Sequence, residues 1–372
     1  MGRFMRIILI VILICAGLVP DCPADTAPGK PNQHQPTALE LLGKYTRALD
    51  STGSFISNAE TVSLQDFEFD ANFDPAHLGT ANAINIKGLK LWMRVEFVTD
   101  GKRTRRKQYT WGHVDIKGGN VDKARPSYFF CNWDGNEYHC HSSIANNPAK
   151  PGVVQIGGLR KDQGATQFCR HSESYVLGYH SDERLDKILR RAGNISLSNK
   201  MENVGGSDCY VIKTETANGT ISLWIDPEHG YNTAKAETMF KTGNPKPDNV
   251  ITTTKLENVR FERIDGLWVP MEADTLNQKM FDINGKKGSI RKKSHYKRTG
   301  FVLNPDHDTL CSFDNPFVSN TELLEGTQVH KVGDPKNYIW RGGKVTPDEG
   351  RPSSRNTTRP KPRRRQGRQP RR

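Results

Sequence analysis

The stretch LKLWMRVEFVTDG, residues 89–101, alternates apolar and polar side chains and then ends in Asp100-Gly101. Successive side chains of a β-strand point to opposite faces of the sheet, so this alternation predicts a strand with one buried face. Asp-Gly is a favoured pair in the short turn of a β-hairpin. The segment therefore predicts one arm of an antiparallel hairpin, whose buried face carries Leu89, Leu91, Met93, Val95 and Phe97.

Asp-Gly and Asn-Gly pairs recur along the chain, between segments rich in β-branched and aromatic residues. Such pairs suit the positive φ angles of tight hairpin turns. A series of hairpins places consecutive strands side by side and antiparallel. The sequence therefore predicts a meandering antiparallel sheet, with further turns at Asp134-Gly135, Asn218-Gly219, Asp265-Gly266 and Asn284-Gly285.

Two other segments show helical spacing. Residues 37–50 begin with the capping-box pair Thr37 and Glu40, and apolar residues follow every three or four positions. A second helix is predicted to start near Ser181 and to stop at Gly193. Its apolar face would carry Leu185, Ile188, Leu189 and Ala192. Strands in series with two helices predict an α+β fold, in which the helices gather on one face of an antiparallel sheet.

The N-terminus has the pattern of an export signal. Two arginines precede the apolar run Ile7–Val19, whose 13 residues are too few to span a membrane, since spanning takes about 20. The run predicts a signal peptide over residues 1–24, cleaved before Asp25, and an uncleaved anchor is the alternative. The mature protein is then expected to be periplasmic or secreted. Residues 25–36 are polar and rich in proline, which predicts a linker.

The positive charge of the chain is concentrated at its C-terminus. Of the net charge of +13, residues 351–372 contribute ten positive charges and no acid, so the body at 37–350 is close to neutral. The tail has no hydrophobic residue, which predicts disorder. A flexible polycation binds polyanions. Because export separates the tail from nucleic acid, the expected partner is an anionic lipid or polysaccharide, and a solubilising tail without a partner is the alternative.

Five cysteines remain after processing, and two of them flank a predicted turn. If the turn comprises residues 134–137, Cys131 and Cys140 lie opposite each other and a cross-hairpin disulfide can form. A two-residue turn would make the pair diagonal and favour two unpaired thiols. His139 and His141 share one strand face while Cys140 points to the other, so these groups do not converge on one metal ion. We expect no metal and no cofactor.

The sequence contains no G-x-S-x-G elbow, phosphate-binding loop, H-E-x-x-H motif or dinucleotide-binding fingerprint. Two carboxylates and a histidine cluster in Asp226-Pro227-Glu228-His229, but the proline and the following Gly230 predict an exposed turn. We therefore expect that the protein is not an enzyme. A hydrolase that uses His139, His141 or the pair Asp226 and His229 is the alternative.

Two basic runs, Lys102–Lys107 and Lys286–Lys293, each follow a predicted hairpin turn. Charged side chains on an edge strand discourage pairing with other sheets, so the runs favour solvated sheet edges. Binding of an anionic lipid or polysaccharide is the alternative.

Five segments together carry a family resemblance: ALELLGKYTRAL, FCNWDGNEYHCHS, DERLDKILRRAG, CYVIKTETANGTISLWIDPEHGY and FERIDGLWVPMEAD. Their order resembles the LolA/LolB/RseB-like superfamily of periplasmic lipoprotein carriers over about residues 37–300. The resemblance implies an incomplete, curved antiparallel β-barrel with helices across its concave face. It also implies an arginine that latches the lid helix, for which Arg94 and Arg125 are the candidates. The chain departs from the family in its C-terminal extension, about 70 residues without a counterpart in the carrier fold.

The resemblance further implies that the concave face binds acyl chains, which cannot cross water unaided. The expected function is non-catalytic binding of acyl chains or a lipoprotein by a monomer, and the same apolar face could instead be a filled core. The alternatives are an RseB-like sensor, or a structural envelope protein whose basic tail docks on an anionic polymer. The candidate ligand-binding residues are Leu89, Leu91, Met93, Val95, Phe97, Ile221, Leu223 and Ile225.

Overall fold

The chain divides into two units, residues 1–36 and 37–372, and all elements described below belong to the second. The predicted signal peptide, most of the linker and the basic tail lie outside the described residues. Among the described residues, no helix combines the length and apolar character needed to cross a membrane. The computed structural model describes residues 35–70, 88–113, 127–133, 135, 138–143, 153–157, 176, 178–180, 183–242, 250–283, 285–310, 312–313, 325–331 and 334–348.

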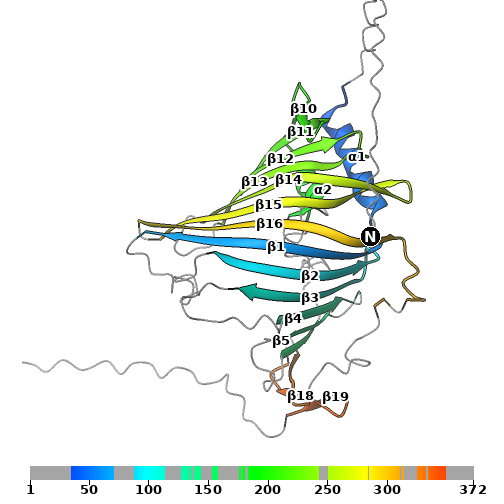
Figure 1. Ribbon diagram of the computed structural model, residues 1–372, viewed down its shortest axis with the longest axis vertical. Coiled ribbons are helices and arrows are strands. Elements are labelled where there is room, and N and C mark those ends of the chain that lie inside the picture. The colour runs from blue at the N-terminus through cyan, green and yellow to red at the C-terminus, as the bar shows by residue number, and fades with distance from the viewer. Residues whose placement is uncertain are drawn as a thin grey trace, which may run out of the picture. The chain divides into compact units, whose positions relative to one another are not determined.

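Strands dominate the described part of the chain, as the sequence predicts (Figure 1). They are β1 (Phe55–Phe69), β2 (Leu89–Thr99), β3 (Thr104–His113), β4 (Ser127–Trp133), β5 (Tyr138–Ser143), β6 (Val153–Gly157), β7 (Tyr179–His180), β8 (Glu183–Arg184), β9 (Ile195–Leu197), β10 (Glu202–Val204), β11 (Ser207–Thr216), β12 (Gly219–Asp226), β13 (Asn232–Thr242), β14 (Val250–Ile264), β15 (Leu267–Ile283), β16 (Lys286–Leu303), β17 (Gln328–Lys331), β18 (Tyr338–Arg341) and β19 (Lys344–Pro347).

One large sheet contains all of these strands except β7 and β8. β9 and β10 pair with β11, and the sheet then continues through β12 to β16, β1, β2 to β6 and β17 to β19. β1 lies between β16 and β2 and therefore joins the two runs (Figure 1). Within the described residues the pairings are antiparallel except that of β6 with β17. The sheet is curved and does not close into a barrel, which confirms the predicted fold class.

Each predicted turn lies at a connection between consecutive strands, but one is displaced by a residue: Thr216 pairs with Gly219, so the loop before β12 is Ala217-Asn218 rather than Asn218-Gly219. Ile264 pairs with Leu267, so Asp265 and Gly266 form a two-residue loop with φ angles of 49° and 83°, as a type I′ turn requires. After β2 the loop is longer, because Thr99 pairs with Thr104.

Both predicted helices are present. α1 (Ala38–Ser51) has the complete capping box, since the Glu40 amide donates to Thr37 Oγ1 and the Thr37 amide donates to Glu40 Oε2. α2 (Leu185–Ala192) ends at Gly193, whose φ is 75°. It begins later than the predicted start near Ser181, because Glu183–Arg184 instead pairs with Tyr179–His180.

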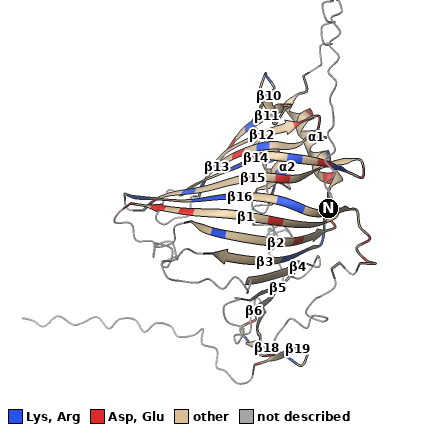
Figure 2. Ribbon diagram, in the orientation of Figure 1, with Lys and Arg blue, Asp and Glu red and all other residues tan. Residues whose placement is uncertain are grey.

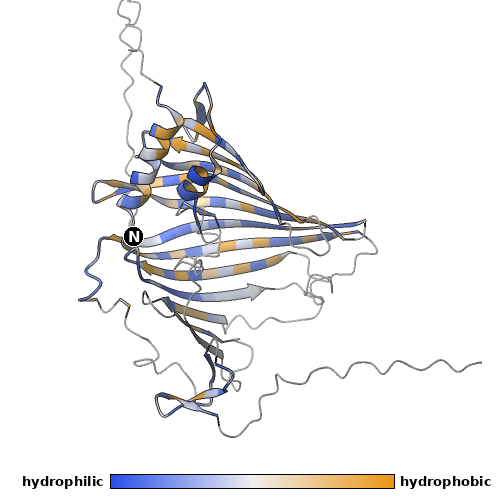
Figure 3. Ribbon diagram, turned by 180° about the vertical axis from the view of Figure 1, so that it is seen from behind, coloured by the Kyte–Doolittle hydropathy of each residue, from blue (hydrophilic) through white to orange (hydrophobic). Residues whose placement is uncertain are grey.

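The main core lies between the helices and one face of the sheet, here called the inner face (Figure 3). α1 contacts β9 and β13, and α2 contacts β9 and β11. Three alanines, Ala59, Ala236 and Ala273, leave room on the sheet for larger helical side chains. Burying each large aliphatic side chain contributes about 1.5–3 kcal/mol. The helices supply Leu41, Leu42, Tyr45, Leu185, Ile188 and Leu189.

The C-terminal strands form a second cluster with the middle of the sheet. Val329 of β17 and Trp340 of β18 pack with Tyr128 and Phe130 of β4. These positions alternate with Cys131, so they lie on the face opposite the inner face. The predicted C-terminal extension therefore adds strands to the sheet and also covers part of its outer side.

Cys131 and Cys140 lie directly opposite each other on β4 and β5 and form a disulfide. Trp133 pairs with Tyr138, so the loop comprises residues 134–137. The predicted disulfide, rather than two unpaired thiols, is therefore correct. Replacing both cysteines with serine is expected to lower the free energy of unfolding by about 2–3 kcal/mol, because the short loop is then open in the unfolded chain. Urea unfolding of the variant should match that of the reduced wild-type protein. Unfolding that matches the oxidised wild type would contradict the prediction.

Candidate ligand-binding face

Strand registers extend the inner face from the helix-covered core to the other half of the sheet. Ala59 of β1 belongs to the main core and pairs with Val95 of β2, which in turn pairs with Gln108 of β3. Paired residues of neighbouring strands lie on the same face. The apolar column of β2 is therefore on the same face as the helices.

The predicted column on β2 divides into a buried and a half-buried part. Met93, Val95 and Phe97 are buried and pack with Phe55, and Phe301 packs against this cluster. The other two members of the column, Leu89 and Leu91, are half-buried. Neither helix contributes a residue to this cluster. The predicted alternation along residues 89–97 is confirmed, and the side chains of Leu89 and Leu91 remain partly accessible.

The predicted group on β12 has a different setting. Ile221, Leu223 and Ile225 are fully buried in the main core beneath the helices. At this end of the inner face the interior is a packed core. A ligand would reach these three residues only if the helices moved away.

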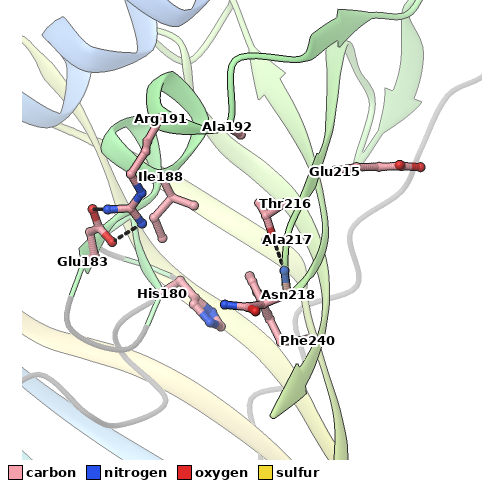
Figure 4. Close-up of a pocket in the computed structure, with 10 residues that line it drawn as sticks. All are labelled: His180, Glu183, Ile188, Arg191, Ala192, Glu215, Thr216, Ala217, Asn218 and Phe240. Carbon is pink, nitrogen blue, oxygen red and sulfur yellow. Dashed lines mark hydrogen bonds and ion pairs between the residues drawn. The ribbon is translucent and has the colours of Figure 1, made fainter. Parts of the chain in front are cut away.

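A pocket of about 570 Å³ lies beside α2 (Figure 4). One wall carries a bidentate ion pair, in which Arg191 donates to Glu183 at 2.7 and 2.8 Å. The other carries Phe240, which stacks on the His180 ring with 4.1 Å between centroids. The pocket thus has both charged and aromatic walls, and none of the eight predicted ligand-binding residues lines it. The remaining lining residues are Ile188, Ala192, Glu215, Thr216, Ala217 and Asn218.

A second pocket, of about 650 Å³, lies where β14 and β16 begin and where β15 and β1 end. Its apolar lining includes Phe69 and Phe281, whose rings are 6.2 Å apart. A Cβ atom added at Gly288 would overlap both rings, so the glycine permits this close aromatic packing. The sequence gives no local sign of this pocket, because its residues come from four strands.

The two basic runs do not lie on sheet edges, so that interpretation is wrong. β3 lies between β2 and β4, and β16 lies between β15 and β1 (Figure 2). On such strands, alternation sends some basic side chains to each face. Arg106 is buried on the inner face and donates to Gln108 at 2.7 Å, and Lys292 is half-buried on the same face. Alternation within the runs predicts that their side chains divide between two faces, but it does not show which face is the inner one.

Asp226 and His229 form a locked turn. The Asp226 carboxylate accepts hydrogen bonds from the amides of Glu228 and His229 and lies 2.6 Å from His229 Nδ1. The imidazole also packs between the rings of Phe261 and Trp268, with centroids at 4.8 and 4.7 Å. Asp226 is 2 % exposed. The cluster is a strand-ending turn, as Pro227 and Gly230 predict, but the predicted exposure is wrong for Asp226, which is buried and hydrogen-bonded within the turn.

Cys209 is buried near this turn and is the free cysteine of the described residues. Burial and, to a smaller extent, the charge of the Asp226 carboxylate raise the pKa of its thiol to about 12. A thiol that stays protonated is a poor nucleophile. Cys209 therefore has the character of a core residue.

His139 and His141 lie opposite Asn132 and Phe130 on β4, while Cys140 is opposite Cys131. The histidines thus point to the outer face, and the disulfide lies on the inner one, as the alternation predicts. Among the described residues, no group of three or more His, Cys, Asp or Glu side chains could hold a metal ion.

An arginine does join the two helices, but it is neither of the predicted ones. Arg184 donates to Asp50 at the end of α1 at 2.6 Å and to both oxygens of Asp186 in α2 at 2.9 Å. Arg94 instead pairs with Glu60 on an exposed surface, and Arg125 lies outside the described residues. Both carboxylates raise the pKa of Arg184 against the effect of burial, so the guanidinium remains charged.

No family model matches the sequence, and no curated protein matches it. Several solved structures are distantly similar. A DUF1329 family protein from Desulfovibrio piger is 16% identical, with a TM-score of 0.36 over 72% of this chain and 93% of that one. Lipovitellin is 7% identical, with a TM-score of 0.29 over 68% of this chain and 26% of that one. MucB, in complex with MucA, is 8% identical, with a TM-score of 0.21 over 72% of this chain and 99% of that one.

Proposed function

We propose that this protein is a non-catalytic envelope protein that binds the acyl chain of a hydrophobic ligand on the inner face of β1–β3. The observation that carries the proposal is the column on β2. At one end of the column, Met93, Val95 and Phe97 are buried. At the other end, Leu89 and Leu91 form a half-buried apolar surface. The helices α1 and α2 pack on the other half of the face.

The part of the column that a hydrocarbon chain can contact is its half-buried end. Leu89 and Leu91 are two residues apart, which at a rise of about 3.3 Å per residue is about 7 Å. One leaflet of a bilayer, which one acyl chain spans, is about 15 Å thick, so about half of such a chain would lie on these two side chains. Each CH₂ group transferred from water to this surface would contribute about 0.8 kcal/mol.

The N-terminal sequence supports an envelope location for this activity. A basic start followed by the apolar run Ile7–Val19 is typical of export signals. A ligand with acyl chains, including a lipoprotein, needs a protein surface to cross an aqueous compartment.

Replacing Leu91 with glutamate is expected to weaken binding of a fluorescent fatty-acid probe at least tenfold. The new carboxylate would replace apolar contact surface with a charge that must stay hydrated. Lys90→Glu is the matched control, since Lys90 is exposed on the opposite face of the same strand. Fluorescence titration of both variants measures the dissociation constants, and thermal melts check that both fold. Equal affinities of the two folded variants would rule out the column as the binding surface.

A further inference from the structure

On the inner face, the apolar side chains of the helix-covered core are followed by polar side chains toward the C-terminal end of β1 and the N-terminal end of β16. Ser63 and Ser294 lie opposite each other and share a hydrogen bond of 2.8 Å. Next to them, Asn277 donates to Thr254 Oγ1 at 2.9 Å. These groups form a continuous band of hydroxyls and amides across β14, β15, β16 and β1.

Lys292 lies in this band, between Asn277 of β15 and Gln65 of β1. It is half-buried and makes no hydrogen bond or ion pair with any described residue. Burial lowers the pKa of Lys292, and the positive charge of Arg106 lowers it further. The charged group that lowers the pKa of this ammonium is therefore another cation. Withdrawing an ammonium from water without an anion nearby is unfavourable.

Among the described residues, no carboxylate lies on the inner face around Lys292. In the described parts of β1, β2, β3, β14, β15 and β16, every Asp and Glu that the register places beside Lys292 or Arg106 lies on the outer face. Arg298, also buried on the inner face, donates to the Tyr296 hydroxyl and the Pro270 carbonyl rather than to an acid. Lys292 and Arg106 are close enough to influence each other, and two neighbouring cations on a partly desolvated face create a positive potential.

The polar band meets the apolar column at Lys292. Gln65 pairs with both Lys292 and Leu89, so Lys292 and Leu89 lie in one row across the sheet, two strands apart. At about 4.8 Å per strand, their backbones are about 10 Å apart. A chain lying along β2 would thus end within reach of the ammonium.

We propose that Lys292 binds the carboxylate of a long-chain fatty acid whose hydrocarbon lies on Leu89 and Leu91, the half-buried end of the column. This inference rests on the proposed function and specifies its ligand as an anionic single-chain amphiphile. Gln65 and Asn277 supply neutral amide donors on either side of the ammonium. A carboxylate carries one charge and so matches one ammonium, whereas a phosphate with a charge near −2 is better matched by a guanidinium fork.

Probe-displacement titrations with palmitate, hexadecanol and hexadecyl phosphate test the proposal. These ligands share one hydrocarbon chain and differ in the head group. Wild-type protein is expected to bind palmitate at least tenfold more tightly than hexadecanol, as a charge-assisted hydrogen bond predicts. Lys292→Gln should remove this preference and leave hexadecanol binding unchanged. Lys292→Arg should retain it, and so should Lys293→Gln, an exposed position on the outer face of the same strand.

The outcomes separate this inference from the proposed function. Equal affinity of wild-type protein for palmitate and hexadecanol would overturn the role of Lys292 while leaving acyl binding intact. Binding of none of the three ligands would overturn both. Tighter binding of hexadecyl phosphate than of palmitate, dependent on Lys292, would overturn the assignment of a carboxylate. Thermal melts verify folding, since Lys292→Gln removes a half-buried charge and should melt at the same or a higher temperature without ligand.

Discussion

Replacing Arg184 with methionine is expected to lower the free energy of unfolding by about 3–5 kcal/mol, the usual effect of breaking a buried ion pair from one side. The side chain of Asp186 is 3 % exposed, and Arg184 contacts both of its oxygens. Without the guanidinium, this carboxylate would be left charged and buried. Urea unfolding followed by circular dichroism measures the change.

Two further variants identify the cause of the Arg184 effect. Asp50→Asn removes only the exposed partner, whose side chain is 58 % exposed, so it should cost less than about 1 kcal/mol. The double variant Arg184→Met/Asp186→Asn removes the buried charge as well and should recover most of the lost stability. If the double variant is as unstable as Arg184→Met alone, the buried carboxylate is not the reason for the loss.

Replacing Leu223 with alanine is expected to lower the free energy of unfolding by about 2–5 kcal/mol, because the packed core beneath the helices would be left with a cavity. Leu223 is fully buried among side chains of both helices and the sheet. Affinity for a fatty-acid probe should stay within about twofold of the wild type, since the half-buried end of the column lies on β2. Urea unfolding and fluorescence titration measure the two quantities.

The Leu223 variant distinguishes a packed core from a ligand lining. A lining residue would lose probe affinity when truncated and would cost little stability in the empty protein. Ser222→Ala is the control, because Ser222 is on the opposite face of the same strand. A large loss of affinity in Leu223→Ala, with unchanged stability, would place the ligand under the helices and contradict the proposed position on β2.

Features set by neighbouring residues were predictable from the sequence. The capping box of Thr37 and Glu40, the alternation of residues 89–97 and the Asp265-Gly266 turn each depend on contacts within a few positions. Alternation also placed His139 and His141 on the face opposite the disulfide. Hairpin pairing fixes the order of consecutive strands, so most of the sheet followed from the same local signals.

Features set by distant pairing were not predictable. Asp50 and Arg184 are 134 residues apart, so the residues around either one give no sign of the ion pair between them. The charge of residues 286–293 favours a sheet edge, and this interpretation is wrong because β16 also pairs with β1, to which no hairpin connects it. For the same reason the sequence does not show on which face of the sheet Lys292 lies. Whether an apolar column becomes core or accessible surface also depends on where the helices pack, which the alternation does not encode.

The position of β1 constrains the order in which the protein can fold. β1 pairs with β16 along its entire length, and the hydrogen-bonded residues Ser63 and Ser294 are 231 positions apart. Pairs this distant in sequence form slowly, because much of the chain must be ordered before they meet. In a chain that emerges from its N-terminus, one edge of β1 stays unpaired until β16 arrives, and an open edge recruits other chains. Truncated or stalled chains that end before residue 286 should therefore aggregate, and a high yield of folded protein would require that this strand be protected until synthesis of the last long strand is complete.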